Sequence, residues 1–353
     1  KLVALGLSFG IIVLGTSKLF NFVLKLAVSR LGVEGFGDYY LLTSTFGSLV
    51  TLCALGLPMS VTRFVSYYRS QKNGEVARDA ISTALTLSAV LTLVVTVIVF
   101  VAADAVANLL GIPHIIQYLR IISLGITGAL LTTFGRAMLM GFLRVRASYL
   151  LDSVDIFGKF LFVFIAITIL GLGLQGAIWA FALASITTGL INAYLAIRLT
   201  NLRGISARIS GTLTSYSWPV SVSEVLTAGT TTALMYMVRA WGSSNDLGYY
   251  AAAVSLASLL HLAPNMILSV FLPLVSSLHA EGKSILSAYK TILLWLFPVV
   301  SIPAVILFAI SPLLIGWLFG PSYQHAAETT RYLILAYGLY AIVVWPLRQL
   351  LDM

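Results

Sequence analysis

Long apolar stretches separated by short polar loops run through the whole chain. A helix needs about 20 mostly apolar residues to cross the ~30 Å hydrocarbon core of a membrane, and most of these stretches reach that length. We therefore predict an all-α polytopic membrane protein with about ten transmembrane helices. The expected helices cover residues 3–29, 38–69, 80–109, 115–142, 149–171, 174–199, 212–239, 247–279, 285–309 and 325–350.

Composition supports this prediction. Hydrophobic residues make up 59% of the chain and charged residues 9%, whereas soluble domains carry about 25% charged residues. The net charge of +9 is spread over loops and helix ends without a long basic run. This pattern disfavours nucleic-acid binding and favours an anionic lipid or an anionic cargo. The single cysteine, Cys53, excludes an intramolecular disulfide and a cysteine-rich metal site.

Lys and Arg concentrate in alternate loops. One set of loops carries Arg63–Arg78, Arg144 and Arg146, Arg198–Arg208 and Lys283, while the opposite set is nearly free of basic residues apart from Arg30 and Arg239. Cytoplasmic loops of membrane proteins are enriched in Lys and Arg. We therefore expect a multi-pass protein of the inner (cytoplasmic) cell membrane with its N-terminus in the cytoplasm. Because the chain begins at Lys1 and ends inside a hydrophobic run, we expect it to be a fragment.

An internal repeat divides the chain. The segment Arg30–Tyr39 has a counterpart in Trp241–Tyr250, and each segment follows a helix with polar interruptions and precedes an unusually long helix. Six predicted helices separate the starts of the two repeats. This spacing indicates two six-helix lobes whose corresponding helices cross the membrane in the same direction. The expected lobes are residues 1–208 and 209–353, the second cut short after four helices. Transporters with such repeats commonly bind substrate between the lobes near the midplane.

The first predicted helix carries two lysines. Each Lys near the centre of a span costs ~2.5–3.5 kcal/mol on the insertion scale, so this helix is poorly suited to face lipid on all sides. Lys18, Asn21 and Lys25 lie at i, i+3 and i+7 and share one polar stripe. We interpret the stripe as the cationic wall of a cavity. The alternative is that Lys25 extends to the interface and Lys18 bonds a neighbouring carbonyl.

Other charges also fall inside predicted spans. Arg120 is the better cavity candidate on the fourth helix, because Arg136 can reach headgroup phosphates. Arg63 ends the apolar part of the second helix and is either an interfacial anchor or a cargo contact. At the start of the fifth helix, the favoured interpretation of the acidic residues is an ordinary helix start with an Asp155–Lys159 pair at i,i+4.

Glu224 is the most informative acid, because it lies well inside the seventh predicted helix. Intramembrane carboxylates are candidates for proton or cation coupling, or for pairing with a basic residue. Glu224 is therefore either a coupling site for H⁺ or Na⁺, a partner of a first-lobe lysine, or a structural acid near the interface. No nucleophile–base pattern, metal-ligand cluster or phosphate-binding Gly loop occurs in the sequence, so we expect no enzyme, no metal and no cofactor.

Several motifs resemble one transporter family. The segments Arg30–Tyr39, Leu55–Arg63, Gly171–Gly176 and Phe271–Gly282 are similar to those of the polysaccharide (O-antigen type) flippases in the multidrug/oligosaccharidyl-lipid/polysaccharide exporter (MOP) superfamily. Related flippases also carry basic residues in their first helix, where this chain has Lys18 and Lys25. The chain departs from the pattern by having about ten helices where the family typically has fourteen.

This resemblance implies a two-lobe flippase that moves a polyprenyl-pyrophosphate-linked oligosaccharide outward by alternating access, for cell-surface polysaccharide synthesis. The implied partners are the lipid-linked oligosaccharide, membrane lipids, and the glycan polymerase and glycosyltransferases of envelope assembly. A cation-coupled multidrug or metabolite exporter of the same superfamily is the alternative. The excess of basic over acidic residues in the expected cavity favours the anionic cargo.

Overall fold

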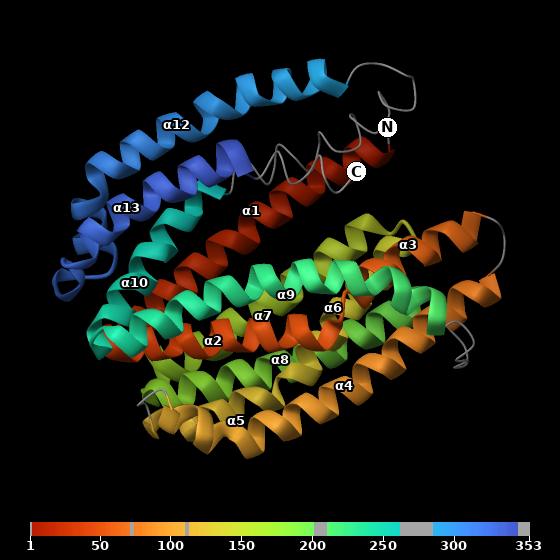
Figure 1. Ribbon diagram of the computed structural model, residues 1–353, viewed down its shortest axis with the longest axis horizontal. Helices are drawn as coiled ribbons and strands as arrows, with labels where there is room; N and C mark the ends of the chain where they lie inside the picture. The colour runs from red at the N-terminus through yellow and green to blue at the C-terminus, as the bar shows by residue number, and fades with distance from the viewer. Residues whose placement is uncertain (1, 71–73, 110–112, 201–209, 262–284, 345–353) are drawn as a thin grey trace.

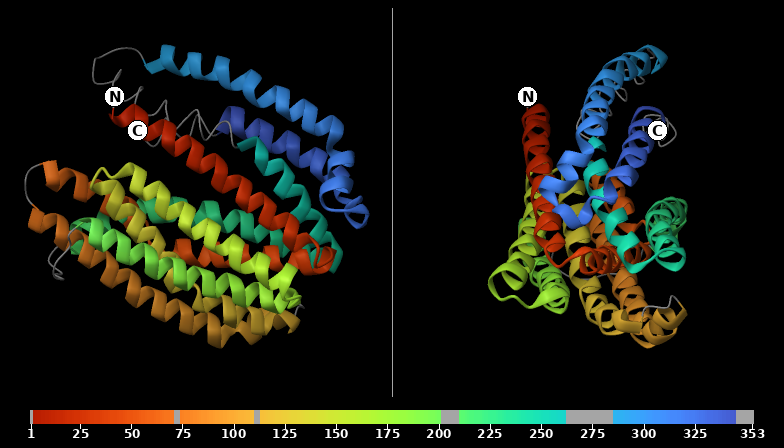
Figure 2. Two further views of the ribbon diagram at one scale, coloured as in Figure 1. Left: turned by 180° about the vertical axis from the view of Figure 1, so that it is seen from behind. Right: turned by 90° about the vertical axis from the view of Figure 1, so that its left-hand side faces the viewer.

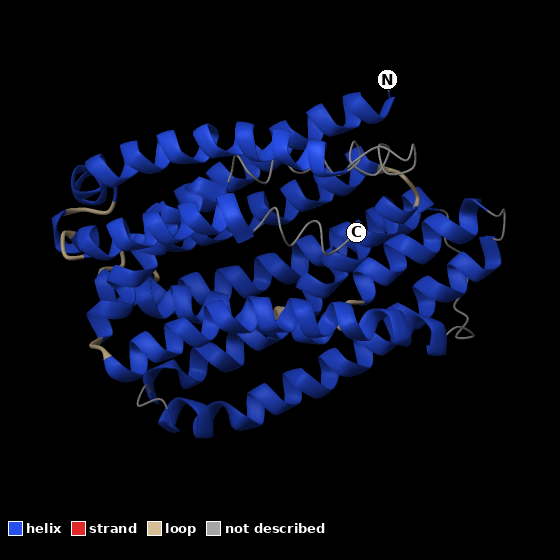
Figure 3. Ribbon diagram, turned by 45° about the horizontal axis from the view of Figure 1, so that its top comes forward, coloured by secondary structure: helices blue, strands red, loops and turns tan. Residues whose placement is uncertain are grey.

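The computed structural model describes residues 2–70, 74–109, 113–200, 210–261 and 285–344. Within these ranges every regular element is a helix (Figure 3). The all-α prediction is therefore confirmed for the described residues.

The predicted first lobe, residues 1–208, contains the elements from α1 to α8. Its elements are α1 (Leu2–Ser29), α2 (Val33–Ala54), α3 (Leu57–Ser70), α4 (Gly74–Leu109), η1 (Pro113–Ile115), α5 (Ile116–Leu124), α6 (Ile126–Gly141), α7 (Val145–Phe164), the π-helix η2 (Ile165–Ile169) and α8 (Gly173–Thr200).

The predicted second lobe, residues 209–353, contains the elements from α9 onward. Its elements are α9 (Ser210–Trp241), α10 (Ser244–Ala257), η3 (Ser258–His261), α12 (Ile285–Leu318), η4 (Pro321–Tyr323), α13 (Ala326–Leu339) and the π-helix η5 (Tyr340–Val344). Residues 262–279 of the predicted helix 247–279 lie outside the described ranges.

The single helix predicted for residues 38–69 is wrong, because the chain breaks between α2 and α3 and bends there by 45°. Leu55 and Gly56 adopt positive φ values of 50° and 63° at the break. A Cβ on Gly56 would lie 2.7 Å from the carbonyl oxygen of Ser217 in α9. Glycine thus permits both the turn and the close approach of the two lobes at this point.

The helix predicted for 115–142 corresponds to one span of 29 residues, Pro113–Gly141, with a local irregularity at Gly125 between α5 and α6. Another predicted boundary differs from the structure. The helix predicted for 285–309 continues to Leu318, although Pro298, Pro303 and Pro312 lie inside it. Proline is tolerated in membrane helices, since neighbouring groups satisfy the backbone carbonyls that it frees.

Three described helical segments are long and apolar enough to cross a membrane: Pro113–Gly141, Gly173–Arg198 and Leu296–Leu318. The bent pair α2–α3 would be a fourth span if it is counted as one segment.

In the first lobe, small residues let helices approach closely. Gly128 of α6 contacts the backbone of Ser185 in α8, and Gly189 of α8 contacts the backbone of Gly128. Such small-residue contacts are typical of helix packing in membranes, where apolar side chains gain little by leaving lipid. Helix α1 packs on α7 (Figures 1 and 2).

The two lobes meet where α2 and α3 lie beside α9 and where α2 lies beside α10 (Figure 1). Hydroxyl groups link α2 and α3 to α9: Ser44 to Thr232 at 2.8 Å, Thr45 to Tyr236 at 2.8 Å and Ser60 to Ser217 at 2.6 Å. Polar contacts between helices of this kind stabilise association within the apolar membrane interior.

One end of the lobe interface is closed. We call it the outer end, because the predicted topology puts it outside the cell. A Cβ on Gly37 of α2 would lie 2.7 Å from the backbone nitrogen of Gly248 in α10. The buried hydroxyl of Tyr323 donates to the carbonyl oxygens of Ser29 at 2.9 Å and Gly32 at 3.0 Å. These contacts bring η4 of the second lobe onto the turn between α1 and α2.

Candidate substrate-binding site between the lobes

The lysines of α1 lie at the interface between the lobes. The ammonium of Lys25 lies 4.9 Å from the ring centroid of Tyr40 in α2, and Lys25 is half-buried. Lys18 lies within electrostatic range of His261 in the second lobe and of Lys25. Within the described part of the chain, neither lysine has a carboxylate at ion-pair distance. The stripe of Lys18, Asn21 and Lys25 therefore brings excess positive charge to this interface.

Aromatic packing orients α1. The ring of Phe20 contacts Phe157 and Phe160 of α7, with centroid distances of 5.5 Å and 5.3 Å. Because successive helical residues are about 100° apart, Lys18 and Lys25 point away from Phe20 by roughly 140–160°. The side of α1 that packs on α7 is thus apolar, and the lysines are on the other side.

The second lobe presents aromatic side chains with polar atoms near these lysines. The ring of His261 in η3 stacks on Tyr337 of α13 with a centroid distance of 4.7 Å and an interplanar angle of 22°. Tyr340 lies 5.7 Å from His261. Tyr250 of α10 and Tyr337 both lie within electrostatic range of Tyr40.

The sequence analysis did not single out these tyrosines. They come from separate segments that no local pattern connects. Only the packing of α2, α10, η3 and α13 brings them together. The two lysines and these rings form the candidate site.

Arg120 does not join the lysines, although the sequence analysis made it a cavity candidate. Its guanidinium bonds Asp104 of α4 at 2.8 Å, and both side chains are largely exposed. Arg120 also donates to the carbonyl oxygen of Phe100 at 3.3 Å. The physical reason is that α5 packs on α4, so an acid from the preceding helix neutralises the arginine.

Arg63 lies in α3 and interacts with α9 of the other lobe. Its guanidinium lies 4.4 Å from the ring centroid of Tyr216, at the opposite end of the interface from Tyr323. Phe64 packs edge-to-face on the same tyrosine at 6.0 Å. This cation–π contact holds the lobes together near the predicted cytoplasmic side.

Glu224 lies half-buried on α9. It is one helical turn from Ala228, whose carbonyl oxygen accepts a hydrogen bond from Ser48 of α2 at 3.1 Å. This position next to the lobe interface suits either a coupling site or a structural acid. The role of Glu224 stays a prediction.

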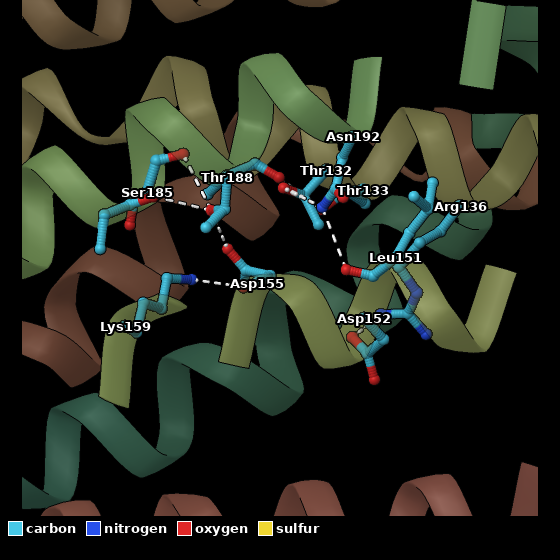
Figure 4. A network of polar contacts seen from close by, with 12 residues as sticks. Thr132, Thr133, Arg136, Leu151, Asp152, Asp155, Lys159, Ser185, Thr188 and Asn192 are labelled. Carbon is cyan, nitrogen blue, oxygen red and sulfur yellow. Dashed lines mark hydrogen bonds and ion pairs between the residues drawn. The ribbon is translucent and has the colours of Figure 1, made fainter. Parts of the chain in front are cut away.

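The acids of α7 are neutralised within the first lobe (Figure 4). Lys159 bonds Asp155 at 2.7 Å, which confirms the pair predicted from their i,i+4 spacing. The hydroxyl of Thr188 in α8 donates to the same carboxylate at 2.7 Å. Asp152 lies about one helical turn before Asp155 and pairs with Arg136 of α6 at 2.7 Å. Asp152 therefore acts on Lys18 only from a longer distance.

No cluster of three or more His, Cys, Asp or Glu side chains that could hold a metal ion occurs among the described residues. The candidate site therefore offers cations and aromatic hydroxyls. Cationic side chains bind phosphate, and aromatic rings with polar groups suit ligands that have both apolar and polar surfaces.

Comparison with solved structures shows the fold. An inward-facing multidrug resistance MATE family transporter of the MOP superfamily matches with a TM-score of 0.76 and 18% identity, over 97% of this chain and 86% of that one. An outward-facing structure described in the same words matches with a TM-score of 0.71 and 17% identity, over 98% and 83% of the two chains. A MOP superfamily transporter from Pyrococcus furiosus, described as having a binding pocket of reverse polarity, matches with a TM-score of 0.73 and 18% identity, over 98% and 83%.

No curated protein matches the chain. The family model described as "Polysaccharide biosynthesis protein" matches residues 6–279. Because this match covers most of the sequence, the chain belongs to the polysaccharide biosynthesis protein family, and its fold is that of the MOP superfamily transporters to which it is similar.

Proposed function

We propose that this transporter moves a polyprenyl-pyrophosphate-linked oligosaccharide from the cytoplasmic to the outer leaflet by alternating access, for the synthesis of cell-surface polysaccharide. The observation that carries the proposal is the pair Lys18 and Lys25, which lie at the lobe interface with no carboxylate at ion-pair distance among the described residues. An uncompensated cation inside a membrane protein is costly, and an anionic cargo offsets that cost.

Electrostatic sign separates this function from the main alternative. An exporter of organic cations needs an interface in which acidic groups outnumber basic ones, because like charges repel the cargo. Here the acids Asp152 and Asp155 are bound to Arg136 and Lys159, which leaves positive charge facing the second lobe. A pyrophosphate group matches this sign, and lysine is a common point-charge ligand of phosphate.

The conformation suits the loading step of such a cycle. The lobes are in contact at the outer end through Tyr323, as loading from the cytoplasm requires. In the predicted topology the N-terminus is cytoplasmic and the protein lies in the inner membrane. Cargo then enters from the cytoplasm, where lipid-linked glycans are made.

Energy coupling and partners complete the proposal. Glu224 on α9 is the candidate to bind H⁺ or Na⁺, because a half-buried carboxylate beside the lobe interface can change its surroundings as the lobes move. The partners are the glycosyltransferases that supply the lipid-linked glycan and the polymerase that consumes it.

The test replaces Lys18 and Lys25 together with Gln in the full-length protein, expressed in a flippase-deficient strain. Each glutamine retains much of the lysine's length and removes the charge. We expect loss of surface glycan and accumulation of the lipid-linked precursor inside the cell. Insertion and protein level are measured on isolated membranes.

Arg120→Gln is the matched control, since it also removes one positive charge but from an exposed pair with Asp104. An exposed ion pair contributes at most about 1 kcal/mol, so export should stay normal. Unchanged export by the double lysine variant at normal protein level would refute the proposal. Failure of the unmutated protein to restore glycan, together with lower accumulation of a cationic dye, would support the multidrug alternative instead.

A further inference from the structure

We propose that His261, Tyr337, Tyr340 and Tyr250 form a sugar-binding wall on the second lobe, opposite the lysines of α1. This inference rests on the proposed function, because it assigns to these rings the sugar that is joined to the pyrophosphate. We call the four side chains the aromatic wall.

The aromatic wall lies beside the apolar packing that holds its helices together, and Tyr337 packs against that core on one side. Leu260 and Ile334 lie on the same elements as His261 and Tyr337, and both are buried with exposures of 4% and 0%. These apolar residues, together with Ala257, form a small core between η3, α12 and α13. His261, Tyr337 and Tyr340 are instead half-buried, so each retains surface that a ligand can reach.

Each ring in the wall carries a polar atom. Sugar rings have apolar C–H faces and a rim of hydroxyl groups. A flat aromatic face beside phenol and imidazole groups meets both requirements.

The arrangement opposite α1 fits a sugar pyrophosphate. Lys18 lies within electrostatic range of His261, and Lys25 lies 4.9 Å from Tyr40, which is itself within range of Tyr250 and Tyr337. The two lysines are separated by about 10 Å along α1, given the rise of 1.5 Å per residue. This length accommodates a phosphate group near one lysine and the adjoining sugar ring beside the aromatic wall.

The wall also explains how binding could involve both lobes. The phosphate would contact the first lobe, and the sugar ring would contact the second lobe. A ligand that contacts both lobes favours whichever conformation brings them to the right separation. The sugar would thus add to binding and to the change of conformation, whereas the pyrophosphate alone would contact mainly α1.

The test measures binding of two soluble probes to the purified full-length protein by isothermal titration calorimetry. One probe is a short-chain prenyl pyrophosphate, and the other is the same molecule carrying one sugar. We expect the sugar to tighten binding about three- to tenfold, the range set by one aromatic stacking contact. Tyr337→Leu should remove that difference and leave binding of the sugar-free probe unchanged.

Two further variants separate binding from folding. Tyr337→Phe keeps the ring and should retain most of the sugar-dependent gain. Tyr332→Leu, on the same helix but 66% exposed, should behave like the unmutated protein. Lys18→Gln combined with Lys25→Gln should weaken both probes equally.

The inference is overturned if the sugar makes no difference to affinity in the unmutated protein. It is also overturned if Tyr337→Leu weakens both probes alike, since that result indicates a structural role. If neither probe binds the unmutated protein, the cationic site itself is wrong and the proposed function fails together with the wall. Binding of the sugar-free probe with no gain from the sugar refutes the wall alone.

Discussion

Tyr323 gives the sharpest test of how the outer end closes. Its side chain is 1% exposed, and its hydroxyl reaches across the lobes to the carbonyl oxygens of Ser29 at 2.9 Å and Gly32 at 3.0 Å. Phe36 and Phe319 pack around the ring with centroid distances of 6.0 Å and 5.7 Å. Tyr323→Phe keeps the ring and its packing and removes only the hydroxyl.

The size of the effect follows from hydrogen bonding. One hydroxyl proton is shared by two carbonyls, so the pair counts as about one net bond of 0.5–1.5 kcal/mol. Neither carbonyl is left without a donor, since the Ser29 oxygen also accepts from the Gly32 nitrogen at 3.2 Å and the Gly32 oxygen from the Phe36 nitrogen at 3.0 Å. In an outward-open state water would solvate the hydroxyl. We therefore expect the outer-closed state to lose about 1 kcal/mol, which raises the open population about fivefold.

The assay measures access from outside the cell. In a Cys53→Ala background, Ser29→Cys introduces a thiol at a position that is 3% exposed in the closed state. A membrane-impermeant maleimide should label this cysteine about five times faster in Tyr323→Phe, because labelling scales with the open population when the closed state dominates.

Tyr332→Phe is the control, since its side chain is 66% exposed on the same lobe. Equal labelling rates in Tyr323→Phe and the parent, at normal protein level, would refute the reasoning. The same conclusion would follow if Tyr332→Phe accelerated labelling as much.

Two further predictions concern packing and charge. Gly248→Ala should open the outer end more than Tyr323→Phe and should abolish export, because the added Cβ would collide with the carbonyl oxygen of Val33. Gly229→Ala is the control, since no atom lies within 4 Å of its added Cβ. This control should behave normally in the same labelling assay. Lys159→Met should lower stability by about 3 kcal/mol, because it leaves the carboxylate of Asp155 buried without its cation. The double variant Lys159→Met, Asp155→Asn should recover part of that lost stability, measured by thermal unfolding in detergent. If the stability losses of the two single variants simply add in the double variant, the pairing is contradicted.

Several features of this protein could be predicted from local sequence. The apolar stretches indicated an all-helical membrane protein, and the motifs between Arg30 and Gly176 indicated the family that the comparison then showed. The i,i+4 spacing of Asp155 and Lys159 gave an ion pair that the structure contains. Such predictions succeed because helix periodicity and insertion energy depend on residues that are close in the chain.

Contacts between distant segments could not be predicted in this way. Arg120 was expected to line a cavity, yet it pairs with Asp104 on the exposed side of the first lobe. The break at Gly56 and the long helix through Pro298 to Pro312 also differed from expectation. Hydropathy cannot distinguish a helix face that touches lipid from one that touches another apolar helix, because both environments favour the same residues.

The sequence by itself thus determined the all-helical class, the charged stripe on α1 and the family. The tertiary structure alone decided which groups from distant segments of the chain meet. It stacks His261 on Tyr337, and it brings the hydroxyl of Tyr323 to Ser29, 294 residues away in the chain. The physical reason is that these contacts depend on how helices from two lobes rotate and approach, which is set by packing of small and aromatic residues far apart in the sequence.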